Sequence, residues 1–433
     1  MRPPRALPTR LRNRQAAVAL SCAVLTAGAA AAVVAVAAAG NPTVHRGTTR
    51  PTTIAAGGEI TRFAASGSVT VQWRGNGHGH GMSQYGARGA ALQGLSAKQI
   101  LAFYYPHTTL TRIPPSHIRV SLSNLVTQLT TVLNNVRGLT VTGYPTLPAA
   151  NSRFRLAPDG NGLVLQALTA GGRWKVLRRG LAATATFSSG KGWVQLLNSD
   201  GTSSRYYGTI TTVRSGSGEL TVNRVRMDQY VKGSVPLEVS ASWPDAAVQA
   251  QAIAARSYAE VMRSQSGSGS LYDICDTSWC QSYGGMARYD RSGNLIWQED
   301  PAALAGNQRT VLHYQGRPVF AQYAASNGGA TVSGGTPYLV GRADPYDSAA
   351  SGDPYLNESK GVRAASIASS YGLKSVTSIE VTRRDGNGPW GGRVLEAYVN
   401  GRTASGKPAH IATTGDELGS ALGVWTDYLR LGP

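Results

Sequence analysis

The chain has 433 residues, of which 42% are hydrophobic and 15% are charged, so it is long enough for about two or three domains and can bury a core. Its formal net charge of +19 favours an anionic partner such as nucleic acid, a membrane or an anionic polymer. The Lys and Arg residues are dispersed and no nucleic-acid-binding motif accompanies them, which argues against nucleic acid.

The first 40 residues have the pattern of an export signal. Five arginines precede an apolar, uncharged run at residues 16–39, and Ala37-Ala38-Ala39 resembles a cleavage site. Because the run is also long enough to span a bilayer, a cleaved signal and a retained membrane anchor stay equally open. Either one places the remainder outside the cytoplasm. Residues 41–72 follow as a predicted linker, since their first part is rich in Pro, Thr and Gly.

The later elements predict an α+β protein with many short strands and one main helix. Apolar residues at helical spacing indicate one or two short helices over 87–105. Short β-branched runs separated by turn residues indicate a β-rich segment at 118–222. An alanine-rich helix is expected at 244–262, with Ser242 as the signal for its N-terminus. Further strands and a short C-terminal helix follow.

Two groups of residues attract attention by type and spacing. Glu238 comes just before the alanine-rich helix, on which Gln249 and Arg256 are seven residues apart and share a face. A glutamate on a loop beside that face could be an acid/base site, or simply a surface residue. The segment GHGHGMSQYGA contains His78 and His80, but a metal site wants three or four ligands, and glycine-rich turns are the alternative.

Four segments carry motifs that occur together in one family. They are GHGHGMSQYGARGAALQG, YVKGSVPLEVSASWPDAAVQAQAIAARSYA, DICDTSWCQSYGG and AQYAASNGGATVSGG. This combination resembles the stage II sporulation protein D family (SpoIID/LytB) over roughly residues 73–430. The resemblance implies a SpoIID-like catalytic domain at 73–433 that acts on peptidoglycan glycan strands lacking stem peptides. Some members resemble lytic transglycosylases, which leave 1,6-anhydro-muramyl ends, and others enhance a wall amidase without catalysis.

The same resemblance assigns roles to individual residues. Glu238 matches the catalytic acid, and Arg256 matches a family arginine that could orient Glu238 or bind sugar oxygens. A glycosidic bond needs a proton on its leaving oxygen, and no second acid is paired with Glu238 in the sequence. The expected substrate-binding residues are His78, Ser83, Gln84, Gln249, Tyr323, Ser326 and Asn327. Of these, Gln249 stands where the family usually has Lys, while His80 is expected to be incidental.

Two departures from the family pattern affect the site. Some members bind zinc through cysteines and a histidine, but Trp279 replaces that histidine here. A disulfide between Cys275 and Cys280 is therefore preferred, with no cofactor expected, and a zinc hydrolase using His78 and His80 is the weakest option.

The second departure concerns order along the chain. The GHGHG segment comes first here, whereas in the family it follows the stretch that TTGDELGSALGVWTDYLRL resembles. We therefore predict a circular permutation in which residues 73–110 fold back against the cleft of Glu238. The expected partners are peptidoglycan and possibly a wall amidase, with membrane contact only through residues 16–39.

Overall fold

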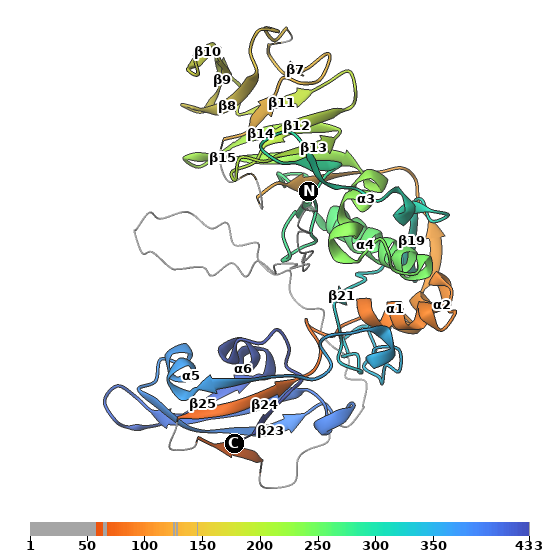
Figure 1. Ribbon diagram of the computed structural model, residues 1–433, viewed down its shortest axis with the longest axis vertical. Coiled ribbons are helices and arrows are strands. Elements are labelled where there is room, and N and C mark those ends of the chain that lie inside the picture. The colour runs from red at the N-terminus through yellow and green to blue at the C-terminus, as the bar shows by residue number, and fades with distance from the viewer. Residues whose placement is uncertain (1–57, 64–66, 124–125, 127–128, 145, 433) are drawn as a thin grey trace, which may run out of the picture. The chain divides into compact units, whose positions relative to one another are not determined.

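The computed structural model describes residues 58–432, apart from 64–66, 124–125, 127–128 and 145 (Figure 1). It confirms the predicted α+β class, with six α-helices and strands in several sheets over these residues. The expected signal or anchor at 1–40 lies outside the described residues. Among those that are described, no helix is both long and apolar enough to cross a membrane.

The strand-rich region predicted at 118–222 contributes most strands of two sheets. The larger is antiparallel and has the order β10 (Trp174–Leu181), β9 (Gly162–Leu168), β8 (Arg153–Asp159), β6 (Thr131–Leu133), β12 (Trp193–Leu197), β13 (Ser203–Tyr207), β17 (Ala287–Tyr289) and β18 (Leu295–Gln298). The second has the order β16 (Ile274–Cys275), β5 (His117–Ser121), β15 (Gly218–Arg226), β14 (Thr209–Ser215), β11 (Thr184–Ser188) and β7 (Thr140–Val141). Both sheets also take strands from 274–298, so the segment does not form its sheets alone.

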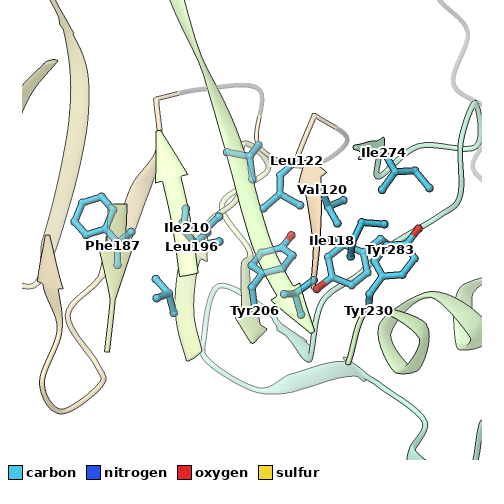
Figure 2. Packing of buried hydrophobic residues seen from close by; sticks show 14 of the residues in the cluster. Ile118, Val120, Leu122, Phe187, Leu196, Tyr206, Ile210, Tyr230, Ile274 and Tyr283 are labelled. Carbon is cyan, nitrogen blue, oxygen red and sulfur yellow. The ribbon is translucent and has the colours of Figure 1, made fainter. Parts of the chain in front are cut away.

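The largest hydrophobic core joins these two sheets to two helices, α3 (Met227–Glu238) and α4 (Asp245–Gln265). Figure 2 shows Ile118 and Val120 beside Tyr230, which lies on α3. The alternation of buried positions along β5 directs Ile118 and Val120 into this core. Each such side chain, when fully buried, stabilises the fold by roughly 1.5–3 kcal/mol.

Helix α3 was not expected from the sequence, because Gly233 and Pro236 lie inside it. The glycine is needed for packing, since a Cβ on Gly233 would lie 2.2 Å from the carbonyl oxygen of Gly285. Pro236 has no N–H for the carbonyl of Lys232, and the N–H of Asp300 donates to that carbonyl instead at 3.3 Å. The prediction that Glu238 lies on a loop was therefore wrong: it is the last residue of α3.

Helix α4 confirms the predicted alanine-rich helix and extends it to Gln265. Its first residue is Asp245, with Pro244 at the capping position, so Ser242 is not its N-terminal cap. The Ser242 hydroxyl instead lies 2.8 Å from the hydroxyl of Ser240. The short alanine side chains let neighbouring elements approach α4 closely, and most of the helix is buried.

The one or two short helices predicted over 87–105 are present as two helices, and both pack against α4. They are α1 (Gln84–Leu92), which begins three residues earlier than expected, and α2 (Ala97–Tyr104). Their buried residues form a second core with α4 and with β19 of a small sheet. That sheet has the order β20 (Arg317–Pro318), β19 (Thr310–Tyr314), β4 (Thr109–Arg112), and a separate parallel pair joins β21 (Tyr323–Ala324) to β3 (Met82–Ser83).

A third core lies around the C-terminal sheet. Its order is β1 (Glu59–Arg62), β23 (Ser375–Arg384), β24 (Val394–Arg402), β25 (Pro408–Thr414). Helices α5 (Ala364–Ser370) and α6 (Gly415–Leu422) pack their apolar residues on β23 and β24 (Figure 1). Three short 3₁₀ turns complete the described elements: Pro301–Leu304, Ala349–Ser351 and Pro389–Gly391.

The predicted linker at 41–72 is too long. Residues 59–62 form β1, and residues 68–72 belong to β2 (Ser68–Trp73), where alternate residues Val69 and Val71 are buried. This period of two is a strand signal that the Pro- and Thr-rich composition of 41–57 obscured. Residues 41–57 and 64–66 of the predicted linker lie outside the described residues.

Strand β2 brings the start of the described chain beside its end. It lies between β22 (Glu358–Arg363) and β26 (Leu429–Gly432), with Trp73 opposite Leu429. Further along, the N–H of Gly77 donates to the carbonyl of Trp425 at 2.6 Å. The GHGHG segment therefore lies next to the C-terminal stretch, as expected. That this order arose by circular permutation stays a prediction.

Candidate functional site

A pocket of about 430 Å³ surrounds the end of α3 and contains Glu238. Five separate parts of the chain line it: the GHGHG segment with the start of α1, the end of α3, the middle of α4, the cysteine loop, and β21 with its neighbours. Among the described residues that line it, Glu238 is the only one with a carboxyl group. The volume lies within the range of about 300–1,000 Å³ that is usual for ligand pockets.

The Glu238 carboxylate is half-buried and held by two donors. The backbone N–H of Ser282 donates to its Oε1 at 3.0 Å, and the Gln84 amide donates to its Oε2 at 3.4 Å. Burial raises the pKa of Glu238 above its ordinary value, and these hydrogen bonds oppose the increase. A carboxyl that keeps its proton closer to neutral pH is suited to act as a general acid.

The GHGHG segment reaches this carboxyl because its backbone turns sharply. Gly81 has a φ of +68° and lies so close to the next segment that a Cβ would be 2.1 Å from the carbonyl oxygen of Gln322. Helix α1 then starts at Gln84, whose side chain points to Glu238. The prediction that this N-terminal segment lies against the Glu238 cleft agrees with this contact and with His78 in the pocket wall.

His78 is neutral near pH 7 in this environment. Burial, and then the positive charges of His80 and Arg393, lower the pKa of His78 to about 4. Its Nδ1 accepts a hydrogen bond from the backbone N–H of His80 at 3.0 Å, which assigns the ring proton to Nε2. His78 can therefore donate one hydrogen bond to a ligand without carrying charge. The His80 side chain is not part of the pocket wall.

Tyr323 also lines the pocket, and a buried amide fixes its hydroxyl. The Gln281 side chain donates to the Tyr323 hydroxyl at 3.0 Å and accepts from the Tyr230 hydroxyl at 2.9 Å. Burial and the nearby charge of Glu238 raise the pKa of Tyr323 well above its ordinary value. Its phenol therefore stays protonated and can donate to a ligand.

Three predicted substrate-binding residues are structural instead. Ser83, Ser326 and Asn327 are at most 1% exposed and do not line the pocket. Asp347 accepts from both serine hydroxyls, at 2.9 and 3.1 Å, and the Asn327 amide donates to Asp344 at 2.6 Å. These bonds tie the start of α1 to the loop after β21. The small polar residues that suggested sugar binding therefore satisfy buried carboxyl groups.

The predicted roles of Arg256 in catalysis and of Gln249 in substrate binding also do not fit the structure. Arg256 is fully buried and bonds to Asp228 at 3.1 Å, to the Asn307 amide oxygen at 3.3 Å and to the Thr310 carbonyl at 3.0 Å. Neither residue lines the Glu238 pocket. The buried ion pair and hydrogen bonds make Arg256 a structural arginine.

The cysteine loop carries the predicted disulfide between Cys275 and Cys280. With both thiols in that bond and Trp279 between them, this loop has no ligand set for the zinc that some family members bind. In the described part of the chain, no group of three or more His, Cys, Asp or Glu side chains is arranged to hold a metal ion.

Several pocket residues were missed from the sequence. Ser282 donates its backbone N–H to Glu238, a contact that no side-chain pattern could reveal. Tyr258 follows two residues after Arg256 on α4, where its ring stacks on Phe320 with centroids 4.5 Å apart. Trp279 was considered only because it replaces a histidine of the family, yet it lines the pocket.

Comparison with known proteins places one part of the chain in a family. Residues 215–314, which contain Glu238, match the family model described as SpoIID, Stage II sporulation protein. The chain is 28% identical over 202 residues to Stage II sporulation protein D of Bacillus subtilis, which is 43% of this chain and 57% of that protein.

Two further relatives match shorter stretches. An amidase enhancer of Bacillus subtilis is 31% identical over 123 residues, which is 27% of this chain and 15% of the enhancer. An uncharacterised protein of Brachyspira hyodysenteriae is 30% identical over 141 residues, 33% of this chain and 36% of that protein. The chain thus spans less than two thirds of the length of each relative. Residues 215–314 therefore match the SpoIID family, and the chain is similar to Stage II sporulation protein D over a longer stretch.

Proposed function

We propose that the chain is an exported enzyme that cleaves the glycan backbone of peptidoglycan as a lytic transglycosylase. The observation that carries the proposal is the isolated, half-buried Glu238, the one carboxyl among the described residues of the pocket wall. A glycoside hydrolase normally uses two carboxyl groups, one as acid and one as nucleophile or base. A single carboxyl suffices when the substrate supplies its own nucleophile.

The proposed reaction has two proton transfers through Glu238. Protonated Glu238 gives its proton to the glycosidic oxygen as the bond from that oxygen to the anomeric carbon breaks. The resulting carboxylate then takes the proton of the 6-hydroxyl of the same muramic acid, whose oxygen bonds to the anomeric carbon. The product is a 1,6-anhydro ring, and Glu238 regains its proton without water or cofactor.

The neighbouring groups suit this cycle. The Ser282 N–H and the Gln84 amide stabilise the carboxylate formed after the first transfer. The neutral His78 and the protonated Tyr323 offer hydrogen bonds to sugar hydroxyls. Export through the apolar run at 16–39 would bring the enzyme to the cell wall, either released or anchored.

A second candidate is a non-catalytic enhancer of a wall amidase. It is supported by the similarity to the amidase enhancer of Bacillus subtilis. In that case the pocket would bind glycan strands, and Glu238 would not act as a catalytic acid.

Peptide-free glycan strands distinguish the two candidates. The purified protein is incubated with the strands, and the products are weighed by mass spectrometry. The enzyme proposal expects anhydro-ended fragments that disappear with Glu238→Gln and persist with Glu396→Gln, a change at an exposed carboxyl. Intact strands together with a stimulated amidase would support the enhancer. Intact strands without stimulation would contradict both.

A further inference from the structure

Trp279 is the most exposed large hydrophobic side chain among the described residues, at 91%. It is also part of the wall of the Glu238 pocket, together with its neighbours Ser278 and Cys280. Tryptophan is usually largely buried, because its indole has the largest apolar surface of any side chain. An indole left in water at the edge of a pocket is therefore available for a ligand.

The turn that carries Trp279 is held rigidly. Its ends are joined by the disulfide between Cys275 and Cys280, and the Cys280 N–H donates to the Thr277 carbonyl at 3.0 Å. Asp276 is buried and accepts from the N–H of Ser123 at 2.9 Å. The backbone of such a turn has little freedom to lose when a ligand binds, which favours affinity.

The same loop leads directly to the proposed catalytic carboxyl. Ser282, three residues after Trp279, donates its N–H to Glu238 at 3.0 Å. A ligand that lies on the indole is therefore next to the group that transfers the proton.

The pocket chemistry selects the class of ligand. Its polar side chains are neutral apart from Glu238, and they include Asn76, Gln322 and Tyr258. Such a wall suits a single uncharged sugar ring with several hydroxyl groups, such as the N-acetylglucosamine that alternates with muramic acid in the strand. A pyranose ring has these hydroxyls around its edge and a face of C–H bonds that can lie on an indole. An anionic peptide would find no cation here, and an apolar peptide would leave the amides unpaired.

We propose that Trp279 is a stacking platform for one N-acetylhexosamine ring of a β-1,4-linked glycan, adjacent to the bond presented to Glu238. The proposal rests on the proposed function for its substrate class. It adds a specific binding subsite formed by a residue that replaces a zinc ligand of other family members.

Binding can be tested without cleavage in the full chain carrying Glu238→Gln. The probe is the β-1,4-linked hexamer of N-acetylglucosamine, with the dissociation constant measured by calorimetry. Adding Trp279→Ala should weaken binding by about tenfold to a hundredfold, the range found for a nucleobase stacked on an aromatic side chain. Trp279→Phe should keep most of the affinity. Trp174→Ala is the matched control, since Trp174 stacks under Arg155 and does not line this pocket.

The outcomes separate this proposal from the enzymatic one. Hexamer binding that does not depend on Trp279, or no binding at all, would overturn the platform. Binding through Trp279 in a wild-type protein that cuts no glycan would keep the platform and reject the transglycosylase. An unchanged kcat/KM of Trp279→Ala on long strands would reject the platform and leave the proposed transglycosylase activity standing. Equal thermal unfolding of all variants excludes a loss of fold.

Discussion

Asp347 is a buried carboxyl that joins the start of α1 to the loop after β21. Its Oδ2 accepts from the Ser83 hydroxyl at 2.9 Å and from the N–H groups of Asn327 and Gly328 at 2.7 and 3.1 Å. Burial, and then the adjacent Asp353 carboxyl, raise the pKa of Asp347 to about 8. At neutral pH the folded protein therefore holds Asp347 largely protonated, beside Asp353.

The sign of the pH effect follows from this increase. The unfolded chain releases the Asp347 proton near its ordinary pKa of about 4, whereas the folded chain retains it up to about 8. The contribution of Asp347 to stability is full below pH 4, falls between pH 4 and 8, and stays low above. One pH unit corresponds to about 1.4 kcal/mol, so the interval from pH 5 to 8 gives at most about 4 kcal/mol. Because the adjacent Asp353 carboxyl causes part of this increase in the pKa of Asp347, we expect about 2–4 kcal/mol.

Asp347→Asn isolates this contribution, because an amide keeps the acceptor oxygen and does not titrate. Guanidinium unfolding is measured for both proteins at each unit from pH 5 to 9. The stability of the variant relative to wild type should increase by about 2–4 kcal/mol from pH 5 to 8 and then level off. Asp290→Asn, at an exposed turn where hydrogen bonds lower the carboxyl pKa, should show no such trend over this range. A difference independent of pH would show that Asp347 is ionised throughout, and would refute the reasoning.

Three further changes test the site and the packing. Gln84→Ala removes a hydrogen bond that lowers the pKa of Glu238, so the alkaline decline of glycan cleavage should move up by a fraction of a pH unit; a downward move in the pH–rate profile would contradict this. Arg256→Met should cost about 3–5 kcal/mol in denaturant unfolding, because Asp228 loses its buried partner, whereas loss of cleavage at unchanged stability would restore a catalytic role. Gly86→Ala places a Cβ 2.0 Å from the Tyr104 hydroxyl and should lower stability by about 1–3 kcal/mol, while Gly361→Ala, with open space around it, should change the unfolding midpoint little.

Periodicity and composition predicted the elements whose local signals agree with the fold. The alanine-rich α4 and the short strands were expected because propensity and burial pattern point the same way. Helix α3 was missed because Gly233 and Pro236 are poor helix residues that the surrounding structure accommodates. Strand β2 was missed because the Pro- and Thr-rich composition before it was extended too far.

For the site, the family motifs led to Glu238, His78, Gln84 and Tyr323, which the fold brings into one pocket. The same motifs also contain residues that maintain the fold, and sequence alone does not separate the two kinds. Ser83 shows the difficulty, because it precedes Gln84 directly yet bonds to Asp347 and caps α1. Which neighbour faces the pocket depends on backbone direction at the start of a helix.

Glu238 and Asp347 both have raised pKa values, so alkaline pH acts on the protein through both of them, in two separable ways. Glu238 must be protonated to act as an acid, and burial raises its pKa. Asp347 must be protonated to hold the start of α1, and with it Gln84, without a buried charge. In wild type both protonated carboxyl groups are lost as pH rises. A decline in cleavage therefore does not by itself identify Glu238 as the titrating group. In Asp347→Asn the Asp347 titration is removed and that of Glu238 remains, so the comparison with wild type separates the two contributions to the decline.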